Sequence, residues 1–460
     1  MERKSVAREK RIETLSHYHG TIDDLLHEIG DGTIDQRIRT FSQTTYDEIV
    51  CALRLAGSIR KAAVVVHGAV GCSAVGMFLN QKGRIGIYST DLSEKDVILG
   101  SEENLRSAIY RAVKERHPEM IFIIRTPAVA INNDDINSVV LEMQEEVDAI
   151  LIPIETDGFQ SKCADNGYDI VLHSLLRNAV KHDDNESNRE DILNIISVSE
   201  NAESLSAVIR IMKALQIKYR ILPQFSSGNK IQQAGNARAS VVLNPDEGGY
   251  FAEQLEENFG VGYLRCEPPV GIENTNVFIR KIAEAFGISA RAEAYIHQME
   301  KEADGRDSEV FWQDKTFFLD LPLPWIPGFI GMLQRHKTAI SGIGIPYVDQ
   351  KNRKILERIS AQAGNITVIV GKEAPFEKVN FLGKTRTDYY ITLENCADFA
   401  AAQGSIPVNL EAMPLFGYDG EDSIIRLLQA EKRMQASADL IYKSMYLKRN
   451  GSWFVKQEVK

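Results

Sequence analysis

The sequence predicts an α/β protein with three Rossmann-like domains, each a parallel sheet with helices on both faces, preceded by an N-terminal helical arm. Three observations lead to this prediction. Short β-branched apolar runs alternate with longer helical patterns along the chain. The runs contain almost no polar residues, which is typical of strands covered on both faces of a parallel sheet. A chain of 460 residues is also long enough for about two to four domains.

The first strand–helix–strand unit is the most clearly marked. Apolar runs at 62–66 and 120–124 are expected to be strands, and a third run follows at 149–152. Between the first two, a helix is expected to begin at Ser101, a good N-cap residue, and to stop before Pro118. This order predicts two parallel strands joined by a crossover helix.

The same alternation continues downstream. Further strands are expected at 192–198, 221–223, 239–243, 261–264, 316–321, 366–370 and 389–393, and a closing helix at 422–446. The first forty residues are polar, show helical spacing and contain no strand-like run. We therefore predict a helical arm and three domains. Their boundaries are 1–40 for the arm, then 41–216, 217–312 and 313–460.

Charge and composition exclude several classes of function. Asp and Glu number 64 against 53 Lys and Arg, which gives a formal net charge of −11. Such a protein is a poor general binder of nucleic acid or anionic membrane, because both need clustered cations. No stretch approaches the roughly 18 apolar residues that span a bilayer, and the first residues lack the apolar core of a secretory signal. We expect a cytoplasmic protein.

The cysteines raise the question of a metal site. The chain has Cys51, Cys72, Cys163, Cys266 and Cys396. An odd number in a reducing compartment argues against a disulfide framework, and thiols packed as small apolar side chains are the default interpretation. Cys266 and Cys396 fit that interpretation, since one follows a strand-like run and the other opens a helical stretch. No P-loop, no Rossmann G-x-G-x-x-G at a strand end and no H-E-x-x-H motif is present.

The segment after the first strand is the leading candidate for chemistry. It reads His67-Gly68-Ala69-Val70-Gly71-Cys72, and Cys51 lies 21 positions before its cysteine. Two glycines allow a tight turn and a close approach of the backbone to a ligand. Cysteine thiolates hold iron–sulfur clusters, so a cysteine beside such a turn is a candidate ligand. The spacing alone also fits an ordinary strand-to-helix turn with an incidental cysteine.

A second candidate lies after the strand expected at 239–243. Asn244, Asp246 and Glu247 stand where ligands collect in open α/β sheets, at the carboxyl end of a strand. They could line a substrate cleft. Alternatively, they could mark only the start of a helix, where acidic side chains favour the positive end of the helix dipole.

Several of these segments together resemble one known family. The run from Cys51 to Cys72, ending VVVHGAVGC, is similar to the cluster-binding segment of the nitrogenase component 1 superfamily. Residues 133–136 (NDDI), 152–159 (IPIETDGF) and 269–275 (PVGIENT) resemble further elements of that family, in the same order. The resemblance is clear over about residues 36–300. It implies that Cys51 and Cys72 bind an iron–sulfur cluster, with His67, Gly68 and Gly71 around it.

Departures from the family pattern refine this implication. Where nitrogenase subunits have a third cysteine, this chain reads Arg125-Thr126-Pro127-Ala128. The resemblance then implies a 4Fe–4S cluster shared across a subunit interface, two thiolates from each side, rather than an eight-iron P-cluster. Cys163 is a candidate third ligand. Where the α-type subunit has its cofactor cysteine, this chain reads Val242-Leu243-Asn244-Pro245, in which Asn244 is the nearest polar residue, and no matching histidine lies near 413–418. Both departures favour a β-type, electron-relay subunit.

The function implied by the resemblance is that of one subunit of a nitrogenase-like two-component reductase. Its partners would be a like-folded α-type subunit, in a heterodimer or an α2β2 tetramer, and an ATP-hydrolysing iron protein; a homodimer is an alternative. Electrons would pass through the interfacial cluster to a substrate-reducing site. A scaffold or carrier that assembles a metal cofactor is the second hypothesis, and an α/β binding protein without a cluster is the third. The sequence does not identify the substrate.

Overall fold

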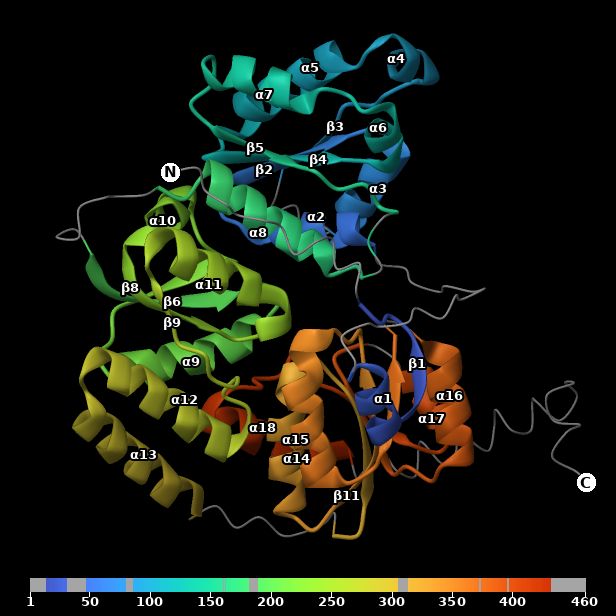
Figure 1. The fold of residues 1–460 in the computed structure, drawn as a ribbon, viewed down its shortest axis with the longest axis vertical. Coiled ribbons are helices and arrows are strands. Elements are labelled where there is room, and N and C mark those ends of the chain that lie inside the picture. The colour runs from blue at the N-terminus through green and yellow to red at the C-terminus, as the bar shows by residue number, and fades with distance from the viewer. Residues whose placement is uncertain are drawn as a thin grey trace, which may run out of the picture. The chain divides into compact units, whose positions relative to one another are not determined.

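The computed structural model describes residues 14–30, 47–79, 86–159, 161, 163–181, 189–304, 313–371, 374–394 and 397–431. These residues fall into two compact units (Figure 1). The first unit takes its described residues from 47–200 and 216–266. The second takes them from 14–30, 201–215 and 267–431. None of the described helices is long and apolar enough to cross a membrane.

The first sheet lies in the first unit and is wholly parallel, with the order β3-β2-β4-β5. Its strands are β2 (Ala62–His67), β3 (Gly86–Ser89), β4 (Met120–Arg125) and β5 (Ile150–Ile154). Side chains alternate along β2: Val64 packs with α2 (Glu48–Ser58) and α8 (Asn166–Asn178), whereas Val65 packs with α5 (Glu102–Arg116) and α7 (Ile136–Gln144). Figure 1 shows these helix pairs on opposite faces of the sheet. Apolar residues on both faces explain the uninterrupted apolar runs.

The second sheet completes the first unit and is also parallel, with the order β7-β6-β8-β9. Its strands are β6 (Glu190–Ser197), β7 (Tyr219–Pro223), β8 (Ala237–Val242) and β9 (Gly262–Tyr263). It shares one apolar core with the first sheet, reached through α8 and α11 (Pro245–Phe259). The expected boundary at 216 separates β6 from the strands with which it pairs, so β6 belongs with the second sheet.

The third sheet forms the core of the second unit, with the order β1-β12-β11-β10-β13-β14. Its parallel strands are β10 (Thr316–Asp320), β11 (Ala339–Ile345), β12 (Thr367–Val370), β13 (Tyr389–Thr392) and β14 (Ile406–Asn409). The remaining strand, β1 (Tyr18–Thr21), pairs antiparallel with β12 at the edge. The three sheets and their helices confirm the predicted α/β class.

The expected helical arm is wrong for the residues that the structure describes at this end. After β1 comes α1 (Ile22–Glu28), and Ile22 and Leu25 are fully buried. This segment therefore completes a sheet edge and a core. The sequence pattern missed it because a four-residue strand with two polar members is too short to show a period.

The remaining helices complete the layers around the sheets. In the first unit they are α3 (Val70–Leu79), α4 (Glu94–Leu99), α6 (Pro127–Asn132) and α10 (Gly228–Gln232). In the second unit they are α9 (Ala202–Ala214), α12 (Gly271–Phe286), α13 (Ser289–Asp304), α14 (Ile326–Gln334), α15 (Arg353–Ala363), α16 (Pro375–Lys384), α17 (Ala397–Ala402) and α18 (Gly417–Glu431). The closing helix, expected at 422–446, begins earlier, and its expected end lies outside the described residues.

Two points in the first unit are favourable for ligands. The chain runs from β2 to β3 on one side and then places β4 on the other side of β2, so the crossovers diverge between β2 and β4. The same divergence occurs between β6 and β8. Ligands of open α/β sheets bind at the carboxyl ends of strands at such switch points. Both of the candidate segments found in the sequence lie there.

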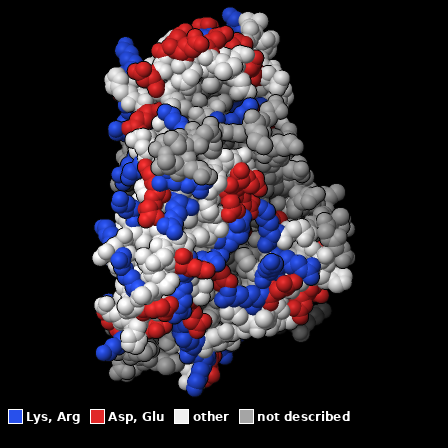
Figure 2. All heavy atoms as spheres, turned by 60° about the vertical axis from the view of Figure 1, so that its left-hand side comes forward, with Lys and Arg blue, Asp and Glu red and all other residues white. Residues whose placement is uncertain are grey.

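Neither sign of charge dominates most of the described face shown in Figure 2. Figure 2 shows Lys and Arg interspersed with Asp and Glu on the face that it views, with acidic residues gathered at its upper end.

Candidate metal centre

The turn that joins β2 to α3 depends on Gly68. A Cβ at this position would lie 2.2 Å from Thr126 Oγ1, so any side chain would collide with the residue that follows β4. The Gly68 N–H donates to Thr90 Oγ1 at 2.9 Å, and the Gly68 carbonyl accepts from the Leu92 N–H at 3.1 Å. The first glycine is therefore required to bring the ends of β2 and β4 together.

His67 holds the same turn from inside the unit. Its side chain is 1% exposed; Nδ1 lies 3.1 Å from Thr90 Oγ1, and Nε2 lies 3.1 Å from Ser101 Oγ. Burial lowers the pKa of His67 to about 4, although the nearby carboxylates of Asp134 and Glu102 oppose the shift. The imidazole is thus neutral at physiological pH and connects three loops by hydrogen bonds. Its position next to a cluster stays a prediction.

Gly71 and Cys72 face outward from the first turn of α3. Both residues are exposed. No atom lies within 4 Å of the position that a Cβ of Gly71 would take, so packing within the described chain does not require a glycine here. Glycine inside a helix is less favourable than alanine by about 1 kcal/mol. A glycine at an open position next to a cysteine is consistent with close approach by a group from outside the chain.

Cys51 lies on α2 and is completely buried. The helix begins at its N-cap, Asp47, whose side chain accepts the Val50 N–H at 2.9 Å. The Cys51 Sγ lies 3.9 Å from Asp165 Oδ1, on the residue that precedes α8. Because α2 packs against both α3 and α8, the structure brings together the three segments that carry Cys51, Cys72 and Cys163.

A buried carboxylate that the sequence did not indicate fixes this arrangement. Glu48 on α2 is 3% exposed and accepts from the Asp157 N–H at 2.5 Å, the Gly158 N–H at 2.8 Å and Asn166 Nδ2 at 2.7 Å. It therefore ties α2 to the turn after β5 and to the start of α8. The available signal was an acidic residue three positions before Cys51, at the start of a mostly apolar helix.

The close contact between α2 and α8 also depends on a glycine. A Cβ at Gly167 would lie 1.9 Å from the Glu48 carbonyl oxygen. Only glycine lets the two helix backbones approach this closely. Gly167 thus helps to place the residues before α8 next to Cys51, and its position in the sequence gave no hint of this contact.

Cys163 is buried just before α8. Its N–H donates to Ser161 Oγ at 3.2 Å, and its carbonyl accepts from Ser161 Oγ at 2.8 Å and from the Asn166 N–H at 3.1 Å. Two neighbours in this turn, at 160 and 162, lie outside the described residues. The structure therefore places the Cys163 backbone in a turn beside α8 and leaves its role as a ligand a prediction.

Residues 125–128, where nitrogenase subunits have a third cysteine, connect strands in this chain. Arg125 Nε donates to the Thr156 carbonyl at 3.0 Å, and Thr156 Oγ1 donates to the Arg125 carbonyl at 2.5 Å. Thr126 Oγ1 donates to the His67 carbonyl at 2.8 Å. These side chains connect the ends of β2, β4 and β5, and a guanidinium cannot replace a thiolate as an iron ligand.

The described cysteines are thiols without disulfides, the group that holds iron–sulfur clusters in proteins. Cys51, Cys72, Cys163 and Cys266 form no disulfides. Within the described part of the chain, no group of three His, Cys, Asp or Glu side chains is placed to hold a single metal ion. A multi-iron cluster spreads its ligands over several irons, so Cys51 and Cys72 on adjacent helices could supply part of its ligand set. Cys266 is half-buried, and Cys396 lies outside the described residues.

Apolar side chains are exposed at the same edge of the first sheet. They are Val70 on α3, Ile98 and Leu99 on α4, Ile131 on α6 and Phe159 after β5, each more than half exposed. Helix α4 buries none of its residues, yet a capping box at Ser93 and the hydrogen bond from Asn132 Nδ2 to the Val97 carbonyl hold it in place. A fixed helix that displays apolar residues is typical of an interaction surface. We call these five residues the apolar edge.

The second candidate segment behaves differently. Asn244 is the N-cap of α11 and its Oδ1 accepts the Asp246 N–H at 3.3 Å, whereas Glu247 accepts from Ser199 Oγ at 2.5 Å. All three candidate residues are at most 9% exposed. Nearby, Glu200 is also buried, and burial raises the pKa of its carboxyl group. These contacts agree with the start of a helix, and the substrate cleft stays a prediction.

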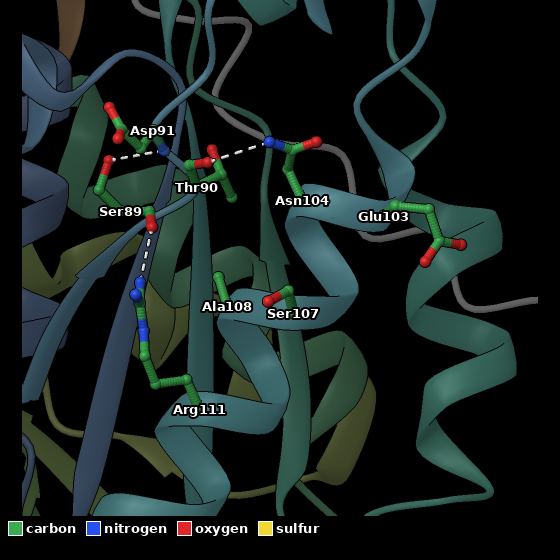
Figure 3. Close-up of a pocket in the computed structure, with 8 residues that line it drawn as sticks. All are labelled: Ser89, Thr90, Asp91, Glu103, Asn104, Ser107, Ala108 and Arg111. Carbon is green, nitrogen blue, oxygen red and sulfur yellow. Dashed lines mark hydrogen bonds between the residues drawn. The ribbon is translucent and has the colours of Figure 1, made fainter.

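A separate polar cavity of about 320 Å³ opens between the end of β3 and the start of α5 (Figure 3). Arg111 Nη2 donates to the Ser89 carbonyl at 2.9 Å, and Asn104 Nδ2 donates to the Thr90 carbonyl at 3.4 Å. The remaining lining residues are Asp91, Glu103, Ser107 and Ala108. Thr90 connects this cavity to the His67 network, but no cysteine lines it.

Comparison with known protein families assigns the chain to one of them. Residues 48–430 match the family model described as nitrogenase component 1 type oxidoreductase. The chain belongs to the nitrogenase component 1 family. Members of this family typically bind iron–sulfur clusters and assemble with related subunits.

The individual relatives have two different roles. The nitrogenase iron-molybdenum cofactor biosynthesis protein NifE of Methanococcus maripaludis is 27% identical over 236 residues, covering 50% of this chain and 49% of that protein. The nitrogenase molybdenum-iron protein alpha chain of Methanosarcina barkeri is 26% identical over 329 residues, covering 67% and 61%. This nitrogenase component 1 family chain thus spans about half the length of the NifE relative. Neither of these relatives is named as a β-type subunit.

A solved structure shows the shared fold. Nitrogenase Cp1 at pH 6.5 superposes with a TM-score of 0.74 at 15% sequence identity, over 86% of this chain and 94% of that chain. At this identity the likeness shows the shared α/β fold alone.

Proposed function

We propose that this chain is one subunit of a nitrogenase-like two-component reductase in the cytoplasm, in which Cys51 and Cys72 hold an iron–sulfur cluster. The observation that carries this proposal is the position of the two thiols. One is buried on α2 and the other is exposed on α3; the helices pack together, and α3 follows β2 at a switch point of the first sheet. When bound, such a cluster accepts and passes on electrons one at a time.

The cluster that fits this pair is a 4Fe–4S cluster shared with a like-folded subunit, each side supplying thiolates. The segment Arg125-Thr126-Pro127-Ala128, which has no cysteine where nitrogenase subunits have their third, supports this choice over an eight-iron cluster. Cys163, beside α8, is a further candidate ligand. The two helices would fix the Cys51 and Cys72 thiolates, and the buried core around Cys51 would lower the local dielectric, which is one way a protein sets a cluster's potential.

The apolar edge supports the proposal of partner proteins. Five apolar side chains exposed at the edge that carries Cys72 would be covered by a like-folded subunit or by an ATP-hydrolysing iron protein that delivers electrons. A heterodimer or an α2β2 tetramer would bury both the second side of the cluster and these residues. The segment 242–245, which has no cysteine where an α-type subunit has its cofactor cysteine, supports an electron-relay role for this chain, with the substrate reduced elsewhere in the complex.

ATP-dependent reduction of the cluster tests this function. The chain is purified anaerobically with the subunit that accompanies it and is mixed with a nitrogenase iron protein and reductant. EPR is recorded with ATP and with a non-hydrolysable ATP analogue. We expect the signal of the reduced cluster to appear only with ATP. An iron-containing complex that stays oxidised under all conditions would contradict the reductase proposal.

A scaffold or carrier for cofactor assembly is the second candidate, and the similarity to a NifE protein favours it. Such a protein would also bind a cluster through Cys51 and Cys72, so iron content does not separate the two functions. Transfer of bound metal to an apo-enzyme, with no ATP-dependent reduction, would select the scaffold.

A further inference from the structure

The polar cavity beside β3 is separate from the proposed cluster site, since no cysteine lines it. It opens at the carboxyl end of a strand in an open α/β sheet, the end at which ligands of such sheets bind. Its volume of about 320 Å³ lies at the lower end of the range of about 300–1,000 Å³ that is usual for small-molecule sites. The position and size of the cavity therefore suit a small ligand.

One face of α5 supplies most of the polar groups of the cavity. Asn104, Ser107 and Arg111 are three and four residues apart, so they lie on the same side of the helix. Ala108 lies among them, is 2% exposed and gives the cavity an apolar wall. Figure 3 shows Arg111 at one end of the cavity and Asp91 and Asn104 at the other. The two ends thus differ in chemistry.

Arg111 is restrained and still has unused hydrogen-bond donors. Its Nη2 donates to the Ser89 carbonyl at 2.9 Å, and its guanidinium carbon lies 5.6 Å from the centre of the Tyr88 ring. These two contacts restrain the guanidinium before any ligand arrives. Arginine has five N–H donors, so the others can bind a carboxylate or phosphate group that enters the cavity.

The opposite end offers hydrogen-bond acceptors. The Asp91 N–H donates to Ser89 Oγ at 3.1 Å, and within the described part of the chain the Asp91 carboxylate has no hydrogen-bond partner. Asn104 Nδ2 donates to the Thr90 carbonyl at 3.4 Å, which leaves Asn104 Oδ1 as an acceptor. Glu103 adds little here, because its side chain is 90% exposed and turns away from Thr90 in Figure 3. This end therefore suits a group that donates hydrogen bonds.

We propose that this cavity binds a small molecule that carries a carboxylate or phosphate group together with hydroxyl or amino groups. The anionic group would bind Arg111, and the hydroxyl or amino groups would donate to Asp91 and to Asn104 Oδ1. The Ser107 hydroxyl lies between the two ends, has no partner among the described residues and can both donate and accept. Phosphorylated polyols and amino acids share this chemistry.

Isothermal titration calorimetry of the full-length chain, purified with the subunit that accompanies it, tests the proposal with two pairs of probes. Glycerol phosphate is compared with glycerol, which lacks the anionic group. γ-Aminobutyrate is compared with butyrate, which lacks the amino group. We expect glycerol phosphate or γ-aminobutyrate to bind with a Kd of about 1 mM or tighter. The matched compound should bind about tenfold more weakly or not at all.

Variants of α5 place the binding in the cavity. Arg111→Gln should weaken binding by about tenfold or more. Lys114→Gln is the matched control, because it removes an exposed cation one turn further along the same helix and outside the cavity. It should bind like the unmodified protein. Ser107→Phe fills the cavity from an exposed position and should abolish binding, which keeps the test decisive if Arg111→Gln fails to fold.

The outcomes decide the proposal and the class of ligand. Binding of glycerol phosphate alone would assign the cavity to phosphorylated polyols, and binding of γ-aminobutyrate alone would assign it to amino acids. If neither compound binds, the proposal is wrong. Equal losses in Arg111→Gln and Lys114→Gln would also overturn it, because they would show a general attraction of anions to surface cations.

Discussion

The carboxyl edges of the first and second sheets share a topology but differ in how their polar side chains are used. Both edges lie at a switch point and both carry segments that the sequence marked as functional. At the second edge, Asn244 and Glu247 bind backbone and side-chain groups at the start of α11 and are almost fully buried. At the first edge, His67 and Gly68 are likewise satisfied internally, but Cys72 and the apolar edge are exposed.

A position at a switch point is therefore not enough to identify a site. The first edge combines a rigid, hydrogen-bonded frame with thiol and apolar groups that face outward. At the second edge, the candidate side chains are buried and form hydrogen bonds within the first unit. Exposure of chemically useful groups on a rigid frame therefore distinguishes the stronger candidate.

The largest expected change is in the free energy of unfolding, and it should differ between substitutions of the two glycines at the first edge. Gly68→Ala would place Cβ 2.2 Å from Thr126 Oγ1, and we expect a loss of about 3 kcal/mol in the free energy of unfolding. Gly71→Ala meets no atom within 4 Å and should change stability by no more than about 1 kcal/mol, toward greater stability. Urea unfolding measures both. Equal destabilisation by the two substitutions would show that Gly71 also packs within the chain.

The neutral His67 makes the first edge sensitive to acid. Because burial lowers its pKa from 6.5 to about 4, the unfolded chain takes up a proton at a higher pH than the folded chain does. The stability that the neutral imidazole confers is therefore complete above pH 6.5 and is lost as pH falls toward about 4, by about 3 kcal/mol.

His67→Gln provides the comparison, since glutamine does not titrate. We expect urea midpoints of the unmodified protein to fall more steeply with decreasing pH than those of the variant. Parallel pH profiles would mean that His67 is not held neutral.

The apolar edge should affect association and leave folding unchanged. Leu99→Asp places a charge in the proposed interface, and Leu141→Asp is the matched control, because Leu141 is 73% exposed on α7, against 72% for Leu99. We expect Leu99→Asp to weaken binding of the accompanying subunit or of the iron protein by about tenfold, or about 1.4 kcal/mol. Sedimentation of the purified complexes measures this. A stronger effect of Leu141→Asp would place the interface elsewhere.

The smallest expected effect is at the second edge. Asn244→Ala removes the N-cap of α11 and should cost about 1 kcal/mol of stability with no change in iron content. Thermal unfolding and iron counting check the two parts. Loss of iron in this variant would give the second edge a role in metal binding and remove the contrast between the edges.

Strands buried on both faces could be predicted from the sequence, whereas β11, which two glycines interrupt, could not. The apolar runs of β2 and β4 identified them within a residue or two. Strand β11 was missed because Gly342 and Gly344 interrupt its pattern. A Cβ there would lie 2.9 Å from the Thr367 carbonyl oxygen and 2.5 Å from Asp320 Oδ1, respectively. Those contacts come from neighbouring strands, which no local pattern reveals.

The residues of the candidate site also divide into those that a local pattern predicts and those whose contacts are distant in the sequence. The local motif from His67 to Cys72 could be read directly, because its residues are consecutive. Glu48 and Asp165 could not, since their partners lie more than a hundred positions away in the chain. Their importance depends on the packing of α2 against α8.

The most direct test of whether this chain holds an iron–sulfur cluster is the iron and sulfide content of Cys72→Ser, purified anaerobically with its accompanying subunit. Cys72 is exposed, so its substitution should leave folding intact, and Cys266→Ser is the control because Cys266 is a half-buried thiol of the same unit. We expect Cys72→Ser to lose the cluster and its visible absorbance, whereas Cys266→Ser should retain both. A full complement of iron and sulfide in Cys72→Ser would contradict the proposal that Cys72 holds a cluster.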